Sequence, residues 1–231
     1  MNPDHRTKAS FGKAGQELEF SGKKAVLLVS VGQRYHEGDK LSATVDLINR
    51  SDIGHVTVAV ADTLQRTNFL DMPEDIAYAH SLRLGNEWLE RNAEILGRLE
   101  PAVEILRWDA ALADDDYAGL RKRVGDEYAT NEEYRGAVDA TIGVFLDRLS
   151  ARDEHADLAQ AFTNCLTYLL EECPAIMPLW AAQGHDFVIY PQPMTSAMAS
   201  TREIFVQPEF PDKCQWLSLK FKKRAQALAA A

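Results

Sequence analysis

The sequence has few cysteines and lacks any hydrophobic run long enough to cross a membrane. Its three cysteines, Cys165, Cys173 and Cys214, form neither an even set nor a C-x-x-C pair. This argues against a disulfide framework and against a structural zinc site, and we expect reduced thiols in a cytoplasmic protein. A membrane-spanning helix needs roughly 20 apolar residues. No stretch approaches that length, so we expect no contact with a membrane.

Positive charge is also scarce. The 25 lysines and arginines stand against 35 acidic residues, which gives a net charge of −10. Such a balance argues against a protein that binds nucleic acid over much of its surface, although it permits a local basic patch. The phosphate-binding pattern G-x-x-x-x-G-K-[ST] is absent, and the first loop lacks G-x-G-x-x-G. We therefore expect no nucleotide cofactor, and no metal.

Two continuous apolar runs rich in valine, at residues 25–31 and 55–61, predict buried parallel strands. The residues between them, 41–49, have the apolar spacing of a helix that Asp39 or Ser42 would cap. Open α/β sheets bind ligands at the carboxyl ends of such strands. The sequence gives three further strand candidates: residues 103–108, 186–191 and 203–207.

Helical segments fill the gaps between these strands. They are expected at residues 74–99, 132–150 and 156–173. The first should be interrupted near Gly85, and Pro174 should end the last, because proline disfavours helix in the residue before it. The alternation predicts a single α/β, Rossmann-like domain whose mostly parallel sheet is flanked by helices. Its expected parts are a flexible segment at 1–22, the catalytic domain at 23–224 and a tail at 225–231.

The first candidate site follows the opening strand, in the sequence Ser30-Val31-Gly32-Gln33-Arg34-Tyr35. A serine at the end of a buried strand can present its hydroxyl at the rim of the sheet. Gly32 lets the backbone turn, so that N–H groups face an incoming carbonyl. Position 28 is leucine, so the G-x-S-x-G elbow of α/β-hydrolases is absent. A serine that only ends its strand remains the alternative.

A second candidate site lies on a later helix. Tyr168 and Glu172 are four residues apart and share one helix face, which Asn164 extends by one turn. Pro174 places Glu172 in the last turn, where the helix dipole disfavours an anion. A bound cation, such as the α-ammonium group of a substrate, would relieve that. The alternative is an exposed glutamate beside a core tyrosine.

The third candidate site is Tyr190, which ends the strand candidate at 186–191. Pro191 follows it and leads the chain out of the sheet. By itself this is an ordinary strand end. His36 lies six residues after Ser30, and we expect it to be a surface residue of the loop rather than a catalytic base.

In their order and spacing these motifs resemble those of the cyclodipeptide synthase family. That family has a nucleophilic serine in S-x-G-x-x-Y, then a Y-x-x-x-E pair with a proline two positions on, and later a catalytic tyrosine. The matching residues are Ser30, Gly32, Tyr35, Tyr168, Glu172, Pro174 and Tyr190. One branch of the family has Asn in the serine loop and His after the last tyrosine. Gln33 and Pro191 resemble the other branch, which has a variable residue and proline there.

The resemblance implies a fold similar to the catalytic domain of class I aminoacyl-tRNA synthetases, without their ATP-binding signatures. It implies an enzyme that joins the amino acids of two aminoacyl-tRNAs into a cyclic dipeptide, through an aminoacyl-Ser30 and a dipeptidyl-Ser30. Glu172 and Tyr168 would hold the α-amino group by hydrogen bonds. Tyr190 would help proton transfer or anchor the dipeptidyl group.

The resemblance also suggests which residues contact the substrates. Val26, Leu28, Ala175 and Ile176 would line the first side-chain pocket, and Val188 with the segment after Pro191 the second. Gly32, Gln33, Tyr35 and Asn164 complete the expected binding residues. The tRNAs would contact a local basic patch on an enzyme expected to be a monomer. Candidates for this patch are Arg83, Arg91, Arg98, the run Arg121-Lys122-Arg123 and the basic tail from Lys213.

Two other interpretations of the same residues remain open. A serine esterase or acyltransferase acting on small esters would also use Ser30. It would need a nearby histidine and acid, which the sequence does not place. Alternatively, the chain is a binding module with the same fold and no catalytic activity. In that case Ser30→Ala would leave its behaviour unchanged.

Overall fold

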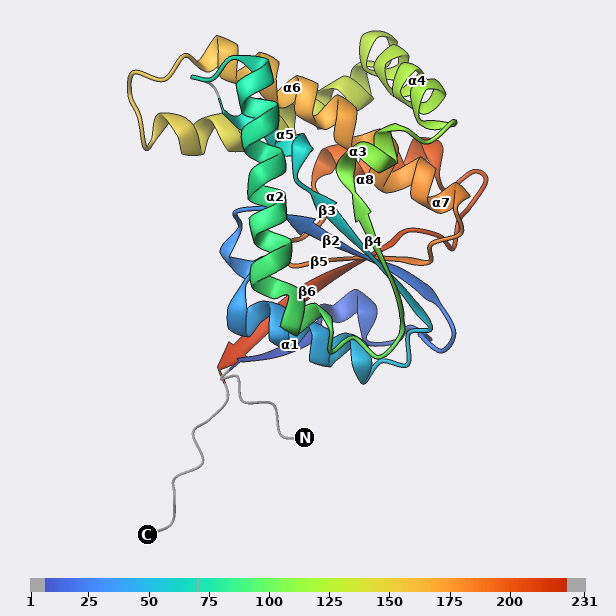
Figure 1. The fold of residues 1–231 in the computed structure, drawn as a ribbon. Coiled ribbons are helices and arrows are strands. Elements are labelled where there is room, and N and C mark those ends of the chain that lie inside the picture. The colour runs from blue at the N-terminus through green and yellow to red at the C-terminus, as the bar shows by residue number, and fades with distance from the viewer. Residues whose placement is uncertain (1–6, 70, 224–231) are drawn as a thin grey trace.

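A six-stranded sheet lies at the centre of the computed structural model, which describes residues 7–69 and 71–223 (Figure 1). The strand order is β1-β6-β5-β2-β3-β4. All neighbouring pairs are parallel except β1 and β6, which run antiparallel. The strands are β1 (Thr7–Phe11), β2 (Lys24–Ser30), β3 (His55–Ala61), β4 (Ala102–Arg107), β5 (Phe187–Tyr190) and β6 (Gln215–Lys223).

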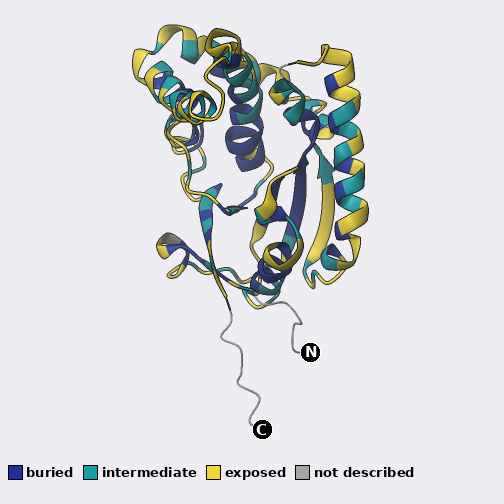
Figure 2. Ribbon diagram, turned by 90° about the vertical axis from the view of Figure 1, so that its left-hand side faces the viewer, coloured by how far each residue is buried: buried dark blue, intermediate teal, exposed yellow. Residues whose placement is uncertain are grey.

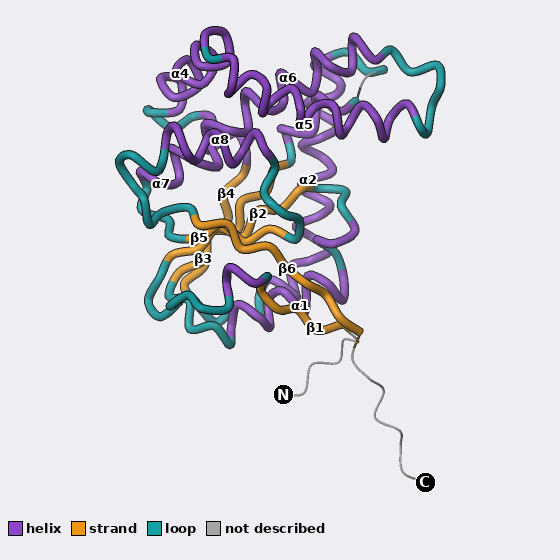
Figure 3. The backbone as a smooth tube through the Cα atoms, turned by 180° about the vertical axis from the view of Figure 1, so that it is seen from behind, coloured by secondary structure: helices purple, strands orange, loops and turns teal. Residues whose placement is uncertain are grey.

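Helices cover both faces of the sheet, as the view from behind shows (Figure 3). One face packs against α1 (Gly38–Asn49) and α2 (Glu74–Leu96). The other face packs against α4 (Tyr117–Thr130), α5 (Glu132–Ser150), α6 (Leu158–Pro174), α7 (Trp180–Ala182) and α8 (Ser196–Phe205). The short elements are α3 (Trp108–Leu112), the 3-10 turns η1 (Lys13–Gly15), η2 (Arg34–His36) and η3 (Thr63–Asn68), and the π-helical turn η4 (Ala175–Leu179).

The two helix layers explain why residues 25–29 in the middle of β2 are all apolar. In β2, Val26 and Leu28 point toward α4–α8, whereas Leu27 and Val29 point toward α1 and α2. A parallel strand buried on both faces has no side left for polar residues. Figure 2 accordingly shows buried strands at the centre and exposed residues on the outer surface of α2.

The strand order creates a switch point between β2 and β5. From β2 the chain adds β3 and β4 on one side, and it then returns to add β5 and β6 on the other. Connections that leave in opposite directions open a crevice at the carboxyl ends of the two strands, where α/β proteins bind ligands. Ser30 is the last residue of β2 and Tyr190 is the last residue of β5. Both therefore lie at this crevice.

The predicted α/β, Rossmann-like architecture is confirmed, and several elements match closely. The strand at 55–61 and the helix at 132–150 have the predicted bounds. All three cysteines are free. Among the described residues, no helix has the length and apolar character needed to cross a membrane.

One predicted strand is wrong, and a strand near the C-terminus was missed. The segment 203–207 is not a strand, because its first three residues end α8, whose N-terminus is capped by the Thr195 side chain accepting from the Met198 N–H. The last strand is β6, where buried Leu217 and Leu219 alternate with more exposed residues. The sequence had suggested only a basic tail there. Residues 225–231 of the expected tail lie outside the described residues.

Part of the segment expected to be flexible also has structure. Within residues 1–22, the stretch 7–11 forms β1, which pairs with β6 along its whole length. Ala9 and Phe11 of β1 pack on α1 in the core. A five-residue strand with three polar residues gives little signal by itself, because its pairing partner lies at the other end of the chain. Residues 1–6 lie outside the described residues.

Helix ends differ from the predictions at three places. Helix α1 begins after Glu37 without a side-chain cap, and Asp39 lies inside its first turn, so neither Asp39 nor Ser42 is the cap. Helix α2 runs through Gly85 without a break. Helix α6 includes Pro174 and continues into the wider turn η4, so this proline changes the helix type rather than ending the helix at residue 173.

Gly85 lets α2 approach the end of β3. A Cβ at this position would lie 2.5 Å from Asp62 Oδ2 and 2.6 Å from Asp62 Cβ. Asp62 is fully buried and forms an ion pair with Arg107, so moving it away would break that pair. The contact therefore requires glycine in the middle of a long helix.

We predict that Gly85→Ala lowers the free energy of unfolding by about 1–3 kcal/mol, because overpacking outweighs the higher helix propensity of alanine. The matched control is Gly143→Ala in α5, where a Cβ would meet nothing within 4 Å. That change should raise stability by up to about 1 kcal/mol. Urea unfolding of both variants provides the comparison. Equal effects of the same sign would contradict the packing argument.

Candidate active site

The ends of β2 and β5 bring a serine and a tyrosine into contact. The Ser30 hydroxyl oxygen lies 3.1 Å from that of Tyr190. The Tyr190 hydroxyl is in turn 2.9 Å from the Tyr35 hydroxyl. Three hydroxyl groups thus form one hydrogen-bonded chain at the switch point. Two of the three sites expected from the sequence therefore meet, and Tyr35 from the loop after β2 joins them.

The turn after β2 explains how Tyr35 reaches this chain. Gly32 has a φ of +89°, a left-handed conformation that residues with a Cβ rarely adopt. A Cβ there would meet nothing within 4 Å, so conformation rather than space favours glycine. The N–H of Gln33 donates to the Ser30 carbonyl at 3.3 Å and closes the turn. The 3-10 turn η2 then directs the Tyr35 hydroxyl back to Tyr190.

Tyr168 and Glu172 lie on successive turns of α6, as their spacing predicts. The Tyr168 hydroxyl donates to a carboxylate oxygen of Glu172 at 3.3 Å. Gln65 on η3 donates from Nε2 to the Tyr168 hydroxyl at 3.4 Å. Because η3 follows β3, this contact ties the α6 pair to the same sheet edge that carries Ser30.

Lack of water dominates the electrostatics of the site. Glu172 keeps some accessible surface but is enclosed by protein, and this burial raises the pKa of its carboxyl to about 8. The hydrogen bond from Tyr168 acts in the opposite direction and is the weaker effect. Burial also raises the pKa values of Tyr168 and Tyr190 well above the usual range. The phenols are therefore neutral hydrogen-bonding groups, and Glu172 needs a cation to ionise at neutral pH.

A cavity of about 240 Å³ lies beside Ser30, Tyr168 and Tyr190, whereas Glu172 and Tyr35 are not among its lining residues. It is lined by Ser30, Gln33, Gln65, Asn68, Thr141, Ile142, Phe145, Cys165, Tyr168, Leu169 and Tyr190. One wall, from α5 and α6, is mostly apolar, and the opposite wall carries amides and hydroxyl groups. Within residues 7–69 and 71–223, no cluster of three or more His, Cys, Asp or Glu side chains could hold a metal ion. The site suits an organic substrate with both an apolar and a polar part.

The side chains expected to line substrate pockets lie elsewhere. These five residues lie in the core between the sheet and the α4–α8 layer, and none of them lines the cavity. Each is at most 2% exposed: Val26, Leu28, Ala175, Ile176 and Val188. Val26, Leu28 and Val188 lie on the sheet, and Ala175 and Ile176 lie on η4. Because sheet and helices pack directly against each other there, no space remains for a substrate side chain. Proximity in sequence to a site residue therefore did not imply contact with the cavity.

The remaining expected residues differ in their placement. Gln33 lines the cavity. Asn164 lies one turn before Tyr168, outside the cavity lining, and accepts a hydrogen bond from Gln160. Pro191 is buried directly after β5. Among these residues, only Gln33 faces the space beside Ser30.

His36 corrects a further expectation, because it is not a surface residue. Only 1% of it is exposed, and its ring packs 4.7 Å from the Tyr35 ring and 5.5 Å from the Tyr190 ring, between centroids. Burial lowers the pKa of His36 to about 3, so the imidazole is neutral. Its Nε2 has no hydrogen-bond partner among the described residues. The imidazole thus supports the two tyrosine rings from behind.

Several cavity residues were missed in the sequence. Gln65 and Asn68 lie on η3, the turn that follows the strand at 55–61, so the rule that ligands bind at strand ends could have found them. The apolar wall from α5, formed by Thr141, Ile142 and Phe145, gave no usable signal. Its role depends on how two helices pack, which the periodicity of either helix leaves open.

Comparisons with known proteins give a clear result at the level of structure alone. No protein-family model matches the chain. No curated protein matches it either. A solved cyclodipeptide synthase (CDPS) from Fluoribacter dumoffii is 35% identical with a TM-score of 0.89, and the match covers 94% of this chain and 99% of that one.

Two more distant structures share the fold. A cyclodipeptide synthase from Candidatus Glomeribacter gigasporarum, solved bound to Phe-tRNAPhe, is 19% identical with a TM-score of 0.75 and covers 96% of this chain and 99% of its own. A Mycobacterium tuberculosis protein, described as relating cyclodipeptide synthetases to type I tRNA synthetases, is 13% identical with a TM-score of 0.64 over 95% and 94% of the two chains. The similarity to the Fluoribacter protein, at 35% identity over nearly all of both chains, shows that this protein belongs to the cyclodipeptide synthase family.

Proposed function

We propose that this chain joins the amino acids of two aminoacyl-tRNAs into a cyclic dipeptide, with Ser30 as the covalent nucleophile. The observation that carries the proposal is the shared cavity of Ser30, Tyr168 and Tyr190 at the β2–β5 switch point. The solved relative bound to Phe-tRNAPhe supports aminoacyl-tRNA as the substrate. We assign the chain to the family branch with a variable residue and proline, here Gln33 and Pro191. The proposal includes a monomer acting in the cytoplasm.

The first step is transfer of an aminoacyl group to Ser30. Its hydroxyl oxygen attacks the ester carbonyl, a new ester bond forms, and the bond to the tRNA ribose oxygen breaks. The Ser30 proton finally reaches that ribose oxygen. Ser30 hydrogen-bonds to the neutral phenol of Tyr190, so we assign the base to a hydroxyl group of the substrate ribose. Exchanging one oxygen ester for another needs no nucleotide energy.

Glu172 and Tyr168 then hold the α-amino group of the bound residue. An ammonium group beside Glu172 favours the carboxylate form, because an opposite charge counteracts the effect of burial. The resulting charge-assisted hydrogen bond is stronger than a neutral one in so dry a site. The raised pKa of Glu172 also suits it to act as a general base. Because this pKa is close to neutral pH, the carboxylate can later take a proton from that ammonium group.

Two attacks by amines complete the reaction. The neutral amine of the second aminoacyl-tRNA attacks the ester on Ser30. A peptide bond forms, the ester bond to Ser30 breaks, a proton from the amine returns to the Ser30 oxygen, and the dipeptide is left on the tRNA. Ser30 then attacks the ester of this dipeptidyl-tRNA, which gives the dipeptidyl enzyme and releases the ribose hydroxyl of the tRNA. The first amine, after losing its proton to Glu172, attacks that ester, closes the ring and releases the Ser30 hydroxyl. Because both ends of the dipeptide share one cavity, orientation supplies part of the rate.

A strip of lysines near the cavity is our candidate contact for tRNA. Lys8 of β1 lies directly opposite Lys222 of β6, and Lys220 points to the same side. We call these three residues the lysine strip. All are exposed, and none forms an ion pair with another residue of the described chain. Like charges placed directly opposite one another are destabilising. A role in binding phosphates would account for them.

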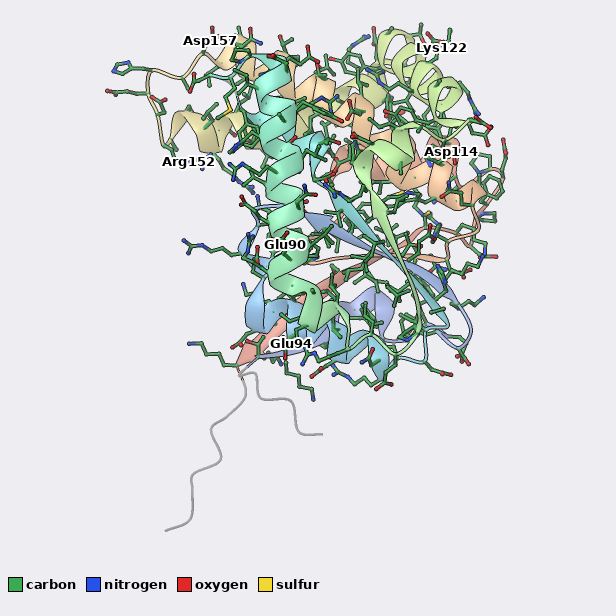
Figure 4. The ribbon with its side chains drawn as sticks, viewed as in Figure 1. Glu90, Glu94, Asp114, Lys122, Arg152 and Asp157 are labelled. Atoms are coloured by element: carbon green, nitrogen blue, oxygen red, sulfur yellow. The ribbon has the colours of Figure 1, made fainter. Side chains whose placement is uncertain are left out.

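The lysine strip continues the row of side chains that begins at the cavity. Alternation along β6 puts Trp216, Lys220 and Lys222 on one face, and the Trp216 ring packs 5.5 Å from the Tyr190 ring, between centroids. Three of the other candidates are less suitable. Arg83, Arg91 and Lys122 each pair with a carboxylate. Figures 3 and 4 also place α4, which carries Lys122, at the opposite end of the molecule from the β1–β6 ribbon.

We predict that Ser30→Ala abolishes the cyclic dipeptide that the wild-type chain releases when expressed in bacteria. Mass spectrometry of the medium measures this and identifies the product. Ser150→Ala is the control, since Ser150 is an exposed residue whose hydroxyl only bonds the carbonyl of Asp147. Turnover of simple esters without tRNA, and no cyclic dipeptide, would instead indicate an esterase.

A second prediction concerns stability and pH. In the unfolded chain Glu172 ionises near its ordinary pKa of 4.5, whereas in the folded chain it stays protonated up to about 8. Between these values the folded state binds more protons, so this residue makes stability fall as pH rises. Glu172→Gln removes that loss. Its melting temperature should match the wild type near pH 4 and exceed it increasingly up to pH 8, as calorimetry would measure. A constant difference would show that Glu172 is not desolvated.

A third prediction concerns the lysine strip. The double change Lys220→Ala/Lys222→Ala should raise KM for aminoacyl-tRNA and make activity less sensitive to salt, because fewer phosphate contacts are lost on raising ionic strength. Lys122→Ala on α4 is the matched control and should change neither quantity. Rates measured across a salt series give both values. If the control has the larger effect, the tRNA contact lies on α4 instead.

A further inference from the structure

Glu171, the residue before Glu172, is held by side chains from several other elements. Its carboxylate accepts hydrogen bonds from Arg66 Nη1 at 2.8 Å and Nη2 at 2.5 Å, and one from Trp108 Nε1 at 3.0 Å. Its backbone carbonyl accepts one from the Tyr117 hydroxyl at 3.1 Å. We call Arg66, Trp108 and Tyr117 the Glu171 clamp. None of these residues lines the cavity, and the proposed reaction does not use them directly.

The clamp is strong because it is partly buried. The side chains of Arg66 and Glu171 are 18% and 12% exposed, and Trp108 is fully buried. A two-pronged arginine–carboxylate contact fixes direction as well as distance. Salt weakens such a partly buried pair less than a surface pair. The contact with Glu171 is also the main reason that the pKa of Arg66 is raised.

The elements that carry the clamp are fixed in turn. The buried Asp62 carboxylate accepts hydrogen bonds from the Thr63 N–H at 2.8 Å, from Arg107 Nε at 2.5 Å and from the Trp108 N–H at 3.4 Å. The Thr63 hydroxyl donates to Asp109 at 2.5 Å. These contacts tie the end of β3 to the end of β4. Arg66 and Trp108 therefore extend from a rigid base rather than from free loops.

The end of α6 needs such support. Pro174 has no N–H, so the carbonyl of Leu170 lacks its normal helical donor. After it, the N–H of Ala175 bonds the Glu172 carbonyl, three residues back, and the chain continues as the wider turn η4. Backbone hydrogen bonds alone therefore define the last turn of α6 less well than the turns before it. That turn carries Glu172.

We propose that Arg66 is a positioning residue: through Glu171 it fixes the rotation of the last turn of α6, and so directs Tyr168 and Glu172 toward the acyl group on Ser30. This inference rests on the proposed function. Successive residues of a helix point about 100° apart, so holding side chain 171 sets the direction of side chain 172. Gln65, the residue before Arg66, contacts Tyr168 directly. One 3-10 turn thus holds both Tyr168 and the turn that bears Glu172.

Arg66 also has an electrostatic effect that separates positioning from mere stability. It neutralises Glu171, whose carboxylate would otherwise stand uncompensated beside Glu172 and oppose ionisation of Glu172. Removing the arginine charge should therefore raise the pKa of Glu172 above its wild-type value. Loss of packing elsewhere in the protein would not produce that change.

The test compares Arg66→Met with Arg66→Lys, which keeps the charge but loses the two-pronged contact. Arg83→Met is the matched control, because Arg83 pairs with Glu87 on the exposed face of α2. At temperatures where each variant is folded, Arg66→Met should lower kcat for cyclic dipeptide formation about 100-fold with little change in KM, the size expected when a reacting group is misplaced by about 1 Å. Arg66→Lys should lie between, and Arg83→Met should match the wild type.

The second measurement needs no activity. Titration of the Glu172 carboxyl, followed by ¹³C NMR and assigned with Glu172→Gln, should shift to higher pH in Arg66→Met. It should be unchanged in Arg66→Lys and in Arg83→Met. If Arg66→Met does not fold, the kcat of Arg66→Lys decides, and a wild-type value overturns the proposal.

Other outcomes are equally decisive. A lower melting temperature with wild-type kcat in Arg66→Met would give Arg66 a structural role only and overturn the proposal. If the wild-type chain makes no cyclic dipeptide, the proposed function fails, and the titration still decides whether Arg66 acts on Glu172. An unshifted titration in folded Arg66→Met would then overturn it.

Discussion

A carboxylate withdrawn from water is the feature on which the site depends. Glu172 is enclosed by protein, and burial raises its pKa to about 8. In water a carboxylate and an ammonium group attract each other weakly, but in a dry site the same pair is far stronger. We propose that the site recognises an amino group because the protein leaves too little water around Glu172 to stabilise its negative charge. The proposed proton transfer to Glu172 depends on the same burial.

The fold supplies the desolvation and the geometry together. Because β2 and β5 lie at the switch point, their ends meet, and the Ser30 hydroxyl reaches that of Tyr190. The α4–α8 layer packs over this face of the sheet, and its helix α6 carries Glu172. The Glu171 clamp then ties α6 to the ends of β3 and β4. Ser30 belongs to the sheet and the Tyr168–Glu172 pair to a helix, so their relative placement depends on such ties.

The sequence predicted the parts of the site whose signals are local. Ser30 and Tyr190 end apolar strands, and Tyr168 and Glu172 have helical spacing; both patterns are visible within a few residues. The cavity wall from α5 and the Arg66–Glu171 contact join residues far apart in the chain, and no local pattern encodes them. In β6, alternation of apolar and basic residues was present, but the charge of the segment suggested a solvated tail. The segment 203–207 failed for the opposite reason, since a short apolar run fits a helix as well as a strand.

The side-chain pockets expected next to Ser30 are filled by core residues, which shows why a sequence motif does not define a substrate. The residues before Ser30 along β2, such as Leu28, pack against the helix layer and leave almost no accessible surface. Space exists instead toward α5, where Phe145 and Cys165 line the cavity. The positions of Ser30, Tyr190 and the Tyr168–Glu172 pair follow from strand ends and helix spacing, which tolerate much sequence change. The shape of the cavity follows from how α5 and α6 pack, and a single substitution there changes the volume open to a side chain. We therefore expect the shape of the cavity, rather than the three motifs, to decide which amino acids this chain joins.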